Sequence, residues 1–335
     1  MKFSRSVLVA AGAAAFAMSA GSASAETTLK AITSLPTTLE LAQSFLHNFR
    51  DAVNAANKGV VNIEYLGGPE VVPPRKAGDA LRRGQFDMLH SPTAYYIGLV
   101  PEGYALTLAT KTPVELRANG GWEILQKIWK EKANAKLLAW GESGTQYNTY
   151  LGQEPKFKAN GNVSLAGFKM RVTGTYRPLF TALGATGVGI KATEVYTALQ
   201  RGVVQGFGWP DVGVVKLGLT KLVKYRISPP FYRSNNTVTV NLDVWNKLPS
   251  NVQKALEAAA PTYEKKAIDY MEGYRKKDED ALIAAGMKTI DLKDGPKKNY
   301  IDSANISVWN RLKKQSKYAD VLHEKCFPDW TPPKS

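Results

Sequence analysis

The first half of the chain beyond residue 25 alternates between short apolar runs and amphipathic stretches. TLKAIT, VVNIEYL and FDMLHS predict strands, and RKAGDALRRG predicts a helix between the last two. The segment at 37–59 predicts a helix opened by a Thr37–Glu40 capping box and closed by Gly59. Its apolar residues recur at helical spacing: Ala42, Phe45, Leu46, Phe49 and Val53. This alternation is typical of an α/β unit with a mostly parallel sheet.

The second half repeats the alternation with different residues. Strands are predicted over KLLAWGES, QYNTYLG, FKMRVTG and VVQGFGW, and helices over YRPLFTALG and TEVYTALQRG. NNTVTVNLDVWNKLP is expected to form an extended crossing segment. A Ser250–Gln253 capping box then opens a long helical stretch, which Pro261 is expected to kink or split. Its periodic positions are Leu256, Ala260, Tyr263, Ala267, Tyr270 and Tyr274.

Two such units predict two lobes, because the chain beyond residue 25 is longer than one hydrophobic core usually covers. Lobe I is predicted to comprise residues 26–149 plus 238–278, and lobe II residues 150–237 plus 279–335. Lobes joined by crossing segments leave a cleft between them, and clefts between domains are preferred ligand sites. This architecture indicates hinge closure on a small molecule.

Residues 1–25 have the pattern of a secretory signal peptide. Lys2 and Arg5 precede an apolar run over 7–18, and residues 23–25 have the small side chains of a cleavage site. The run is too short to span a bilayer, and no later segment approaches the roughly 20 apolar residues of a membrane helix. We therefore expect export, which in a bacterium means the periplasm.

The chain is basic, with 44 Lys and Arg against 29 Asp and Glu. From the formal charge of +15, the loss of two cations with the signal peptide, Lys2 and Arg5, leaves +13. Export disfavours nucleic acid as the partner, and segments such as YEKKAIDYMEGYRKKDED lack the aromatic-interleaved patch of a nucleic-acid groove. We interpret most of this charge as solvated surface and expect no nucleic-acid partner.

The sequence offers little that indicates catalysis or a structural metal. His47, His90 and His323 are far apart, and the one cysteine, Cys326, can neither form an intramolecular disulfide nor complete a zinc set. A Walker-type phosphate loop and a G-x-S-x-G elbow are missing, and GVGIKATE lacks the spacing of a dinucleotide site. Enzymatic activity therefore finds no support.

An arginine inside a strand-like run is the main indication of a binding site. Arg171 stands between Met170 and Val172 in LAGFKMRVTG, and a buried guanidinium is costly unless an anion meets it. Arginine grips a carboxylate through two parallel hydrogen bonds, so the partner is either a ligand or a structural salt bridge. Further polar and aromatic candidates lie at or near the ends of the predicted strands: Ser91, Tyr95, Tyr96, Gln146, Tyr147, Phe207 and Trp209.

Four motifs run in order along nearly the whole chain beyond residue 25: RKAGDALRRGQFDMLHSP, LAGFKMRV, LGATGVGIKATEVYTALQRGVVQGFGWP and LDVWNKLPSNVQ. Together they resemble the DctP-type substrate-binding proteins of tripartite ATP-independent periplasmic (TRAP) transporters. The resemblance implies a two-lobed α/β fold of the periplasmic-binding-protein type, class II-like, with an interlobe cleft and a long helix spanning both lobes. It also implies delivery of an organic acid to the membrane permease subunits of a TRAP transporter.

The resemblance carries over to individual residues. Arg171 matches the family's selectivity arginine, while Gln146 and Trp209 resemble a glutamine and a tryptophan of the branch that binds 2-oxo acids. That branch places a glutamate before the tryptophan to help hold a metal cation, and this chain has Gly208 there. We therefore expect no metal and no cofactor.

These observations predict a monomeric extracytoplasmic receptor for a small carboxylate. Arg171 is expected to anchor the ligand, with Gln146 as its hydrogen-bonding partner, beside Ser91 and walls formed by Tyr95, Tyr96, Tyr147, Phe207 and Trp209. Two rivals remain, a binding protein of an ATP-driven (ABC-type) importer and a secreted bilobal enzyme. A neighbouring permease gene would decide the first, and turnover of candidate acids the second.

Overall fold

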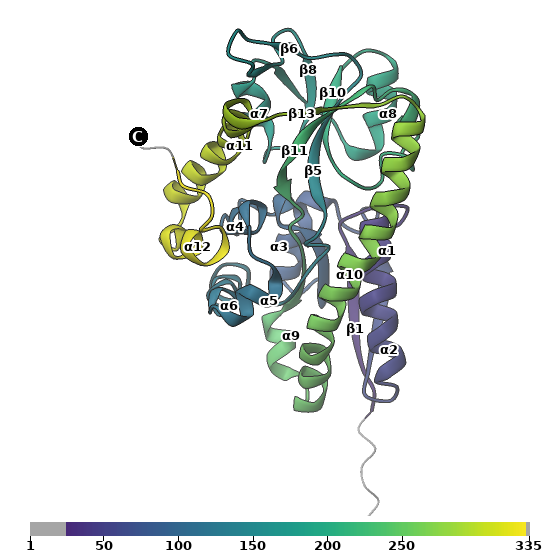
Figure 1. Cartoon of the computed structure of the whole chain (residues 1–335). Coiled ribbons are helices and arrows are strands. Elements are labelled where there is room, and N and C mark those ends of the chain that lie inside the picture. The colour runs from purple at the N-terminus through teal and green to yellow at the C-terminus, as the bar shows by residue number, and fades with distance from the viewer. Residues whose placement is uncertain (1–24, 333–335) are drawn as a thin grey trace, which may run out of the picture.

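The computed structural model describes residues 25–332 and forms two α/β lobes, one in the lower and one in the upper part of Figure 1. The two-lobed fold expected from the sequence is confirmed. The predicted signal peptide, residues 1–25, lies outside the described residues except for Ala25. Within 25–332, none of the helices has both the length and the apolar character needed to cross a membrane.

Lobe I contains a five-stranded sheet in the order β2 (Val61–Gly67), β1 (Thr27–Thr33), β3 (Met88–Pro92), β12 (Asn236–Asn241) and β4 (Ala135–Gly141). β1 is parallel to both of its neighbours. β12 is antiparallel to β3 and β4, because it enters this sheet on its way back from lobe II. The strands predicted over TLKAIT, VVNIEYL, FDMLHS and KLLAWGES are confirmed.

Lobe II contains a six-stranded sheet in the order β13 (Lys288–Asp291), β11 (Tyr225–Arg233), β5 (Gln146–Leu151), β10 (Gly206–Pro210), β8 (Lys169–Val172) and β9 (Thr186–Gly189). β8 is parallel to β9 and β10, whereas β5 is antiparallel to β10 and β11. The sheet is therefore mixed rather than mostly parallel. A short hairpin of β6 (Lys156–Phe157) and β7 (Val163–Ser164) extends from this lobe.

Helices pack around both sheets. Those of lobe I are α1 (Glu40–Ser44), the π-helical η1 (Phe45–Asp51), α2 (Ala52–Ala56), α3 (Ala77–Arg82), α4 (Gly103–Leu108), α5 (Pro113–Ala118), α6 (Gly121–Ala133) and α9 (Leu242–Lys247). Lobe II adds α7 (Arg177–Ala182), α8 (Val195–Gln200) and α11 (Asp294–Gln315), and single 3₁₀ turns form η2 (Pro74–Lys76), η3 (Thr93–Tyr95), η4 (Ala192–Glu194) and η5 (Leu219–Lys221). The predicted Thr37–Glu40 capping box is wrong, because Leu39 takes the N-cap position without a side-chain bond and Glu40 is already helical.

One long helix, α10 (Ser250–Ala284), spans both lobes, as expected (Figure 1). It packs against β4 and α1 in lobe I, and near its other end Asp278 accepts a hydrogen bond from the backbone of Val215 in lobe II. Pro261 does not split the helix, which is continuous over 35 residues. The Ser250–Gln253 capping box is also wrong, because Pro249 is the N-cap and the Gln253 amide donates to the Trp245 carbonyl.

The chain crosses between the lobes at residues 142–145 between β4 and β5, at residues 234–235 between β11 and β12 and along α10, and once more near its end. The boundaries predicted after residues 149 and 237 fall inside β5 and β12, each of which pairs within one sheet, so the crossings lie in the two linkers instead. The chain also returns to lobe I at its end, where α12 (Ala319–Cys326) packs against α4 and α6. Assigning 279–335 entirely to lobe II therefore does not hold for α12.

A buried carboxylate ties the crossing segments together on the lobe I side. Glu142 follows β4 in the first linker and is fully buried. Its carboxylate accepts hydrogen bonds from Tyr263 of α10 at 2.7 Å and Asn236 of β12 at 3.0 Å, and lies 3.2 Å from the imidazole of His90. Burial alone would raise the pKa of Glu142, but His90 and these hydrogen bonds outweigh it and hold the pKa below its ordinary value.

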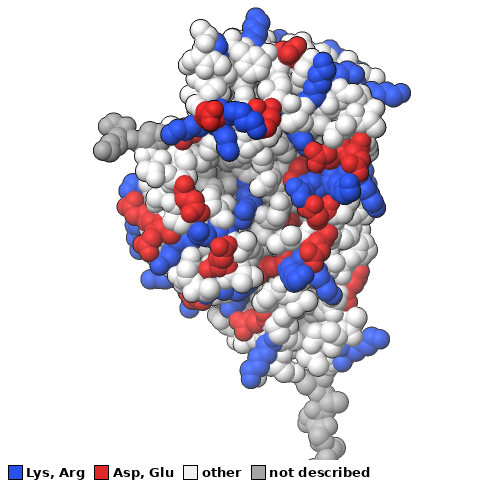
Figure 2. Space-filling model, in the orientation of Figure 1, with Lys and Arg blue, Asp and Glu red and all other residues white. Residues whose placement is uncertain are grey.

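The single cysteine lies deep in the protein at the end of α12. Cys326 is fully buried, and its carbonyl accepts hydrogen bonds from the backbone N–H groups of Thr110 and Lys111. Burial raises the pKa of its thiol to about 12. On the surface, basic and acidic side chains are interspersed over the face shown in Figure 2, as expected for solvated charge.

Candidate ligand-binding site

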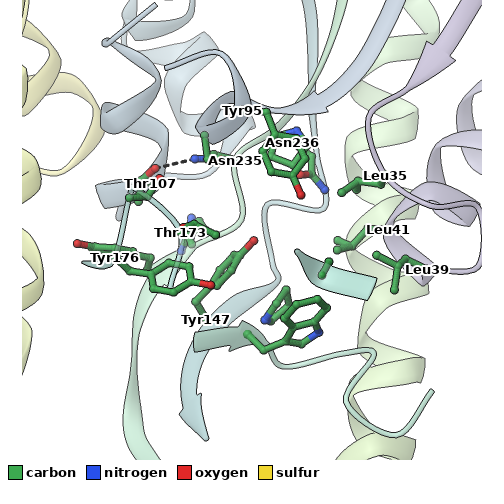
Figure 3. Close-up of a pocket in the computed structure, with 18 of the residues that line it drawn as sticks. Leu35, Leu39, Leu41, Tyr95, Thr107, Tyr147, Thr173, Tyr176, Asn235 and Asn236 are labelled. Carbon is green, nitrogen blue, oxygen red and sulfur yellow. Dashed lines mark hydrogen bonds between the residues drawn. The ribbon is translucent and has the colours of Figure 1, made fainter. Parts of the chain in front are cut away.

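A cavity lies between the lobes (Figure 3). Lobe I contributes the loop after β1, the start of α1, and η3, while lobe II contributes the ends of β5, β8 and β10. Asn235 of the second linker and Asn236 of β12 also line the cavity. A ligand here would contact both lobes and a crossing segment at once.

Arg171, at the carboxyl-terminal part of β8, is the central charge of this cavity. It is only 5% exposed, its Nε donates to the Ile190 carbonyl at 3.0 Å, and its Nη1 donates to the Tyr176 hydroxyl. The guanidinium carbon lies 5.3 Å from the centre of the Trp209 ring, within cation–π range. None of the ion pairs within 4.0 Å in residues 25–332 includes Arg171, so the structural salt bridge considered as an alternative is not formed.

Two tyrosine hydroxyls point into the same cavity (Figure 3). Tyr95 comes from η3 of lobe I and Tyr147 from β5 of lobe II, and neither hydroxyl has a hydrogen-bond partner in the part of the chain that the structure describes. Burial raises the pKa of both phenols, and Arg171 acts in the opposite direction on each. Both hydroxyls therefore stay protonated at neutral pH and are available as donors to an anion near Arg171.

Tyr176 fixes the position of the Arg171 guanidinium and fills the space beside Gly208. Its hydroxyl accepts from Arg171 and donates to the Gly208 carbonyl at 3.0 Å. A Cβ atom added at Gly208 would lie 2.9 Å from the Tyr176 ring, closer than real Cβ contacts. A carboxylate side chain at this position has no room while Tyr176 is in place. Residues 25–332 also contain no group of three or more His, Cys, Asp or Glu side chains suited to a metal ion.

Asp211 is the acidic residue that directly follows β10. Its backbone N–H donates to the Gln146 carbonyl at 2.8 Å, and its Oδ1 is buried without a hydrogen-bond partner in the described part of the chain. Burial raises the pKa of Asp211 to about 7. A carboxyl that binds a proton near neutral pH is a weak ligand for a hard cation.

A wider hollow opens from the cavity toward solvent. It shares Tyr95, Arg171, Thr173 and Ala192 with the cavity. Arg75 of lobe I and Arg177 and Lys191 of lobe II line it, and no Asp or Glu is among its lining residues. Positive side chains on both sides of an entrance attract anions toward Arg171.

Four of the predicted site residues, Tyr95, Tyr147, Arg171 and Trp209, line the cavity together. The other four do not line it: Ser91, Tyr96, Gln146 and Phe207.

Each of these four is held elsewhere. Ser91 is fully buried and its hydroxyl donates to the Pro92 carbonyl, while the Tyr96 hydroxyl is paired with Thr237 at 2.7 Å. Gln146 precedes Tyr147 in β5, and neighbouring strand residues point to opposite faces. Phe207 packs behind Trp209, with 6.3 Å between the ring centres.

Sequence reasoning missed several lining residues: Leu35, Leu39, Leu41, Thr107, Tyr176, Arg233, Asn235 and Asn236. Tyr176 lies five residues beyond Arg171, at the start of a predicted helix, and its place next to the strand was a usable signal. The leucines and asparagines carried no signal, because their spacing in the chain matches an ordinary loop and strand. Only the crossing of the chain brings them to Arg171.

Comparison with known proteins gives the family. The profile of the DctP family, described as bacterial extracellular solute-binding protein, family 7, matches residues 36–315. The chain belongs to the DctP family. The resemblance to TRAP solute-binding proteins stated from the sequence motifs is thereby confirmed, and the family and fold are those of binding proteins.

Two similar proteins are named for the acids they bind. A monocarboxylate 2-oxoacid-binding periplasmic protein of Nostoc sp. is 29% identical over 66% of this chain and 62% of its own length. A C4-dicarboxylate-binding periplasmic protein of Rhodobacter capsulatus is 24% identical over 71% of both chains.

Solved structures share the fold. A TRAP transporter solute-binding protein of Bordetella bronchiseptica, with copurified calcium and picolinate in one active site, superposes with a TM-score of 0.77 at 22% identity, covering 90% of both chains. An extracytoplasmic solute receptor of Bordetella pertussis that binds pyroglutamic acid gives a TM-score of 0.76 at 16% identity, covering 89% of this chain and 99% of that one.

Proposed function

We propose that this DctP-family protein is a periplasmic receptor that binds a small organic carboxylate between its lobes and delivers it to a TRAP permease. The observation that carries the proposal is Arg171, a buried guanidinium in an interlobe cavity with no carboxylate partner among the described residues. The free hydroxyls of Tyr95 and Tyr147 supply further donors beside it. The ligands named for the relatives are organic acids, which supports the same chemistry.

The proposal is tested by a thermal-shift screen of the purified protein across organic acids. A ligand at a hundred times its dissociation constant stabilises the folded state by about 2.7 kcal/mol. Incubation of each stabilising acid with the protein, followed by chromatography, separates a receptor from a secreted bilobal enzyme, because a receptor returns the acid unchanged. Co-purification with TRAP rather than ABC-type permease subunits decides the transporter class, and the family match favours TRAP.

Ligand binding is expected to close the cleft. The lobes are joined by two short linkers and α10, and the cavity is lined from both sides, so a bound acid favours the arrangement in which both walls contact it. Small-angle scattering should show a smaller radius of gyration at saturating ligand. An unchanged radius with full occupancy would indicate a rigid pocket and count against this mechanism.

Binding is expected to be independent of metal cations. Gly208 leaves no space for a carboxylate beside Trp209, and hard cations need several oxygen ligands, preferably charged ones. Arg171 then neutralises the ligand with the help of the tyrosine hydroxyls. Titrations after dialysis against a chelator, in sodium-free and sodium-containing buffers of equal ionic strength, should agree within about threefold; a tenfold loss without cation would restore a metal-bridged mechanism.

A further inference from the structure

An apolar wall faces the charged end of the cavity. Leu35, Leu39 and Leu41, which we call the leucine wall, come from the loop after β1 and the start of α1 in lobe I (Figure 3). They are 5%, 6% and 8% exposed, so they are largely buried already. Leu35 and Leu41 pack with Val212 of lobe II and Met271 of α10, which holds the wall in place.

Some polar side chains that line the cavity are free to bind a ligand, whereas others are already hydrogen-bonded within the protein. Around Arg171, the hydroxyls of Tyr95 and Tyr147 have no partner in residues 25–332. Elsewhere the polar side chains already donate within the protein: Tyr232 to the Ala304 carbonyl at 2.6 Å, Asn235 to Thr107 at 2.7 Å and Asn236 to Glu142 at 3.0 Å. The free tyrosine hydroxyls therefore lie at the Arg171 end of the cavity.

Arg233 is the second cation of the cavity lining, and its environment differs from that of Arg171. Its Nη1 donates to the Lys111 carbonyl at 3.1 Å. Unlike Arg171, Arg233 is only partly buried, so water can still solvate its charge. Arg171 is 5% exposed and lies beside the free tyrosine hydroxyls, so one anionic group of the ligand is drawn to Arg171.

We infer that the ligand is a monocarboxylate with an apolar body, and that the leucine wall selects this body. The inference rests on the proposed function and narrows its substrate class. The carboxylate lies at Arg171 and the free tyrosine hydroxyls, and the body lies between the leucine wall and Trp209. A hydroxylated body or a second carboxylate placed against leucine loses its water without gaining hydrogen bonds, which is unfavourable.

Three six-carbon acids of similar length test the substrate class: hexanoate, adipate with a second carboxylate, and L-gulonate with a hydroxylated body. Calorimetric titration is expected to give hexanoate at least a tenfold higher affinity than either of the others. Shortening the acid to pentanoate should weaken binding about fourfold, the effect of one buried methylene. Adipate or gulonate binding as tightly as hexanoate would overturn the inference and leave a carboxylate receptor standing.

Variants of the wall test the assignment of residues. Leu39→Asn is expected to weaken hexanoate at least tenfold and to change adipate by less than threefold. Leu66→Asn is the matched control, since Leu66 is 39% exposed in β2 and does not line the cavity. If Leu39→Asn does not fold, Leu39→Ala replaces it and should shift the preference toward octanoate, which fills the added space.

An unchanged hexanoate-to-adipate ratio in the folded wall variants would overturn the role of the leucines. Failure of all organic acids to bind the wild-type protein would instead overturn the proposed function, so the two failures are distinguishable.

Discussion

Replacing Arg171 by alanine is expected to reduce carboxylate affinity by at least thirtyfold while the protein stays folded. Truncating one partner of a buried charge pair costs roughly 2 to 5 kcal/mol, and about 1.4 kcal/mol corresponds to a tenfold change in affinity. Arg171→Lys should recover only part of this loss, because an ammonium group cannot reproduce the planar fork or the contact with Trp209. Calorimetric titration with the best acid of the screen measures both effects.

The matched control is Arg82→Ala, which removes an exposed arginine of α3 that pairs with Asp79 far from the cavity lining. It should leave the affinity unchanged within the error of titration. Ligand affinity within threefold of wild type in Arg171→Ala would show that Arg171 is not the anchor.

Replacing Glu142 by alanine is expected to lower the free energy of unfolding by about 3 to 5 kcal/mol. The substitution leaves Tyr263 and Asn236 with buried polar groups that have lost their acceptor, and it leaves His90 without its carboxylate neighbour. Urea unfolding at neutral pH measures the loss. Glu123→Ala on α6 is the control, because Glu123 is exposed, and an effect of Glu142→Ala no larger than that of the control would contradict the role of this cluster.

The sign of the pH dependence follows from the lowered pKa of Glu142. A carboxyl whose pKa is lower in the folded state stabilises the fold above its unfolded pKa, about 4.3 for glutamate, and loses this contribution as the pH falls through the folded pKa. The wild-type protein should therefore lose stability steeply below about pH 4. Glu142→Gln should show a smaller loss over the same range.

The sequence predicted the parts of the fold that depend on local pattern. The apolar runs of β1, β2, β3 and β4 and the periodic positions Leu256, Ala260, Tyr263 and Ala267 of α10 identified these elements, because most residues of these runs and all four helix positions are buried. β11 was missed because Pro229 and Pro230 lie inside it and are typical of a loop or an edge strand. The capping boxes were wrong because the helices begin out of frame with the motifs: the N-cap of α1 is Leu39, two residues after Thr37, and the N-cap of α10 is Pro249, one residue before Ser250.

The binding-site residues also divide into those that the local sequence identifies and those that it does not. Arg171 was identifiable because the charge and the apolar strand around it are both visible in one short segment, and a charge in a buried strand needs an anionic partner. Tyr96 and Tyr95 are adjacent in the sequence, yet one packs into the core and the other lines the cavity, a difference set by the turn at η3. The leucine wall faces Arg171 only because the fold brings lobe I against lobe II. No local sequence pattern predicts such a contact between distant segments.

The burial of Cys326 has a practical consequence for measuring how the two lobes move relative to each other. Because burial raises the pKa of this thiol and closes it off from solvent, it is expected not to react with maleimide dyes or spin labels, and the natural chain should serve as a cysteine-free background. One new cysteine on each lobe, Val114→Cys and Val203→Cys, at positions 67% and 47% exposed, would then be the only labelled sites. The separation of the two labels becomes a direct gauge of how far the cleft opens, molecule by molecule.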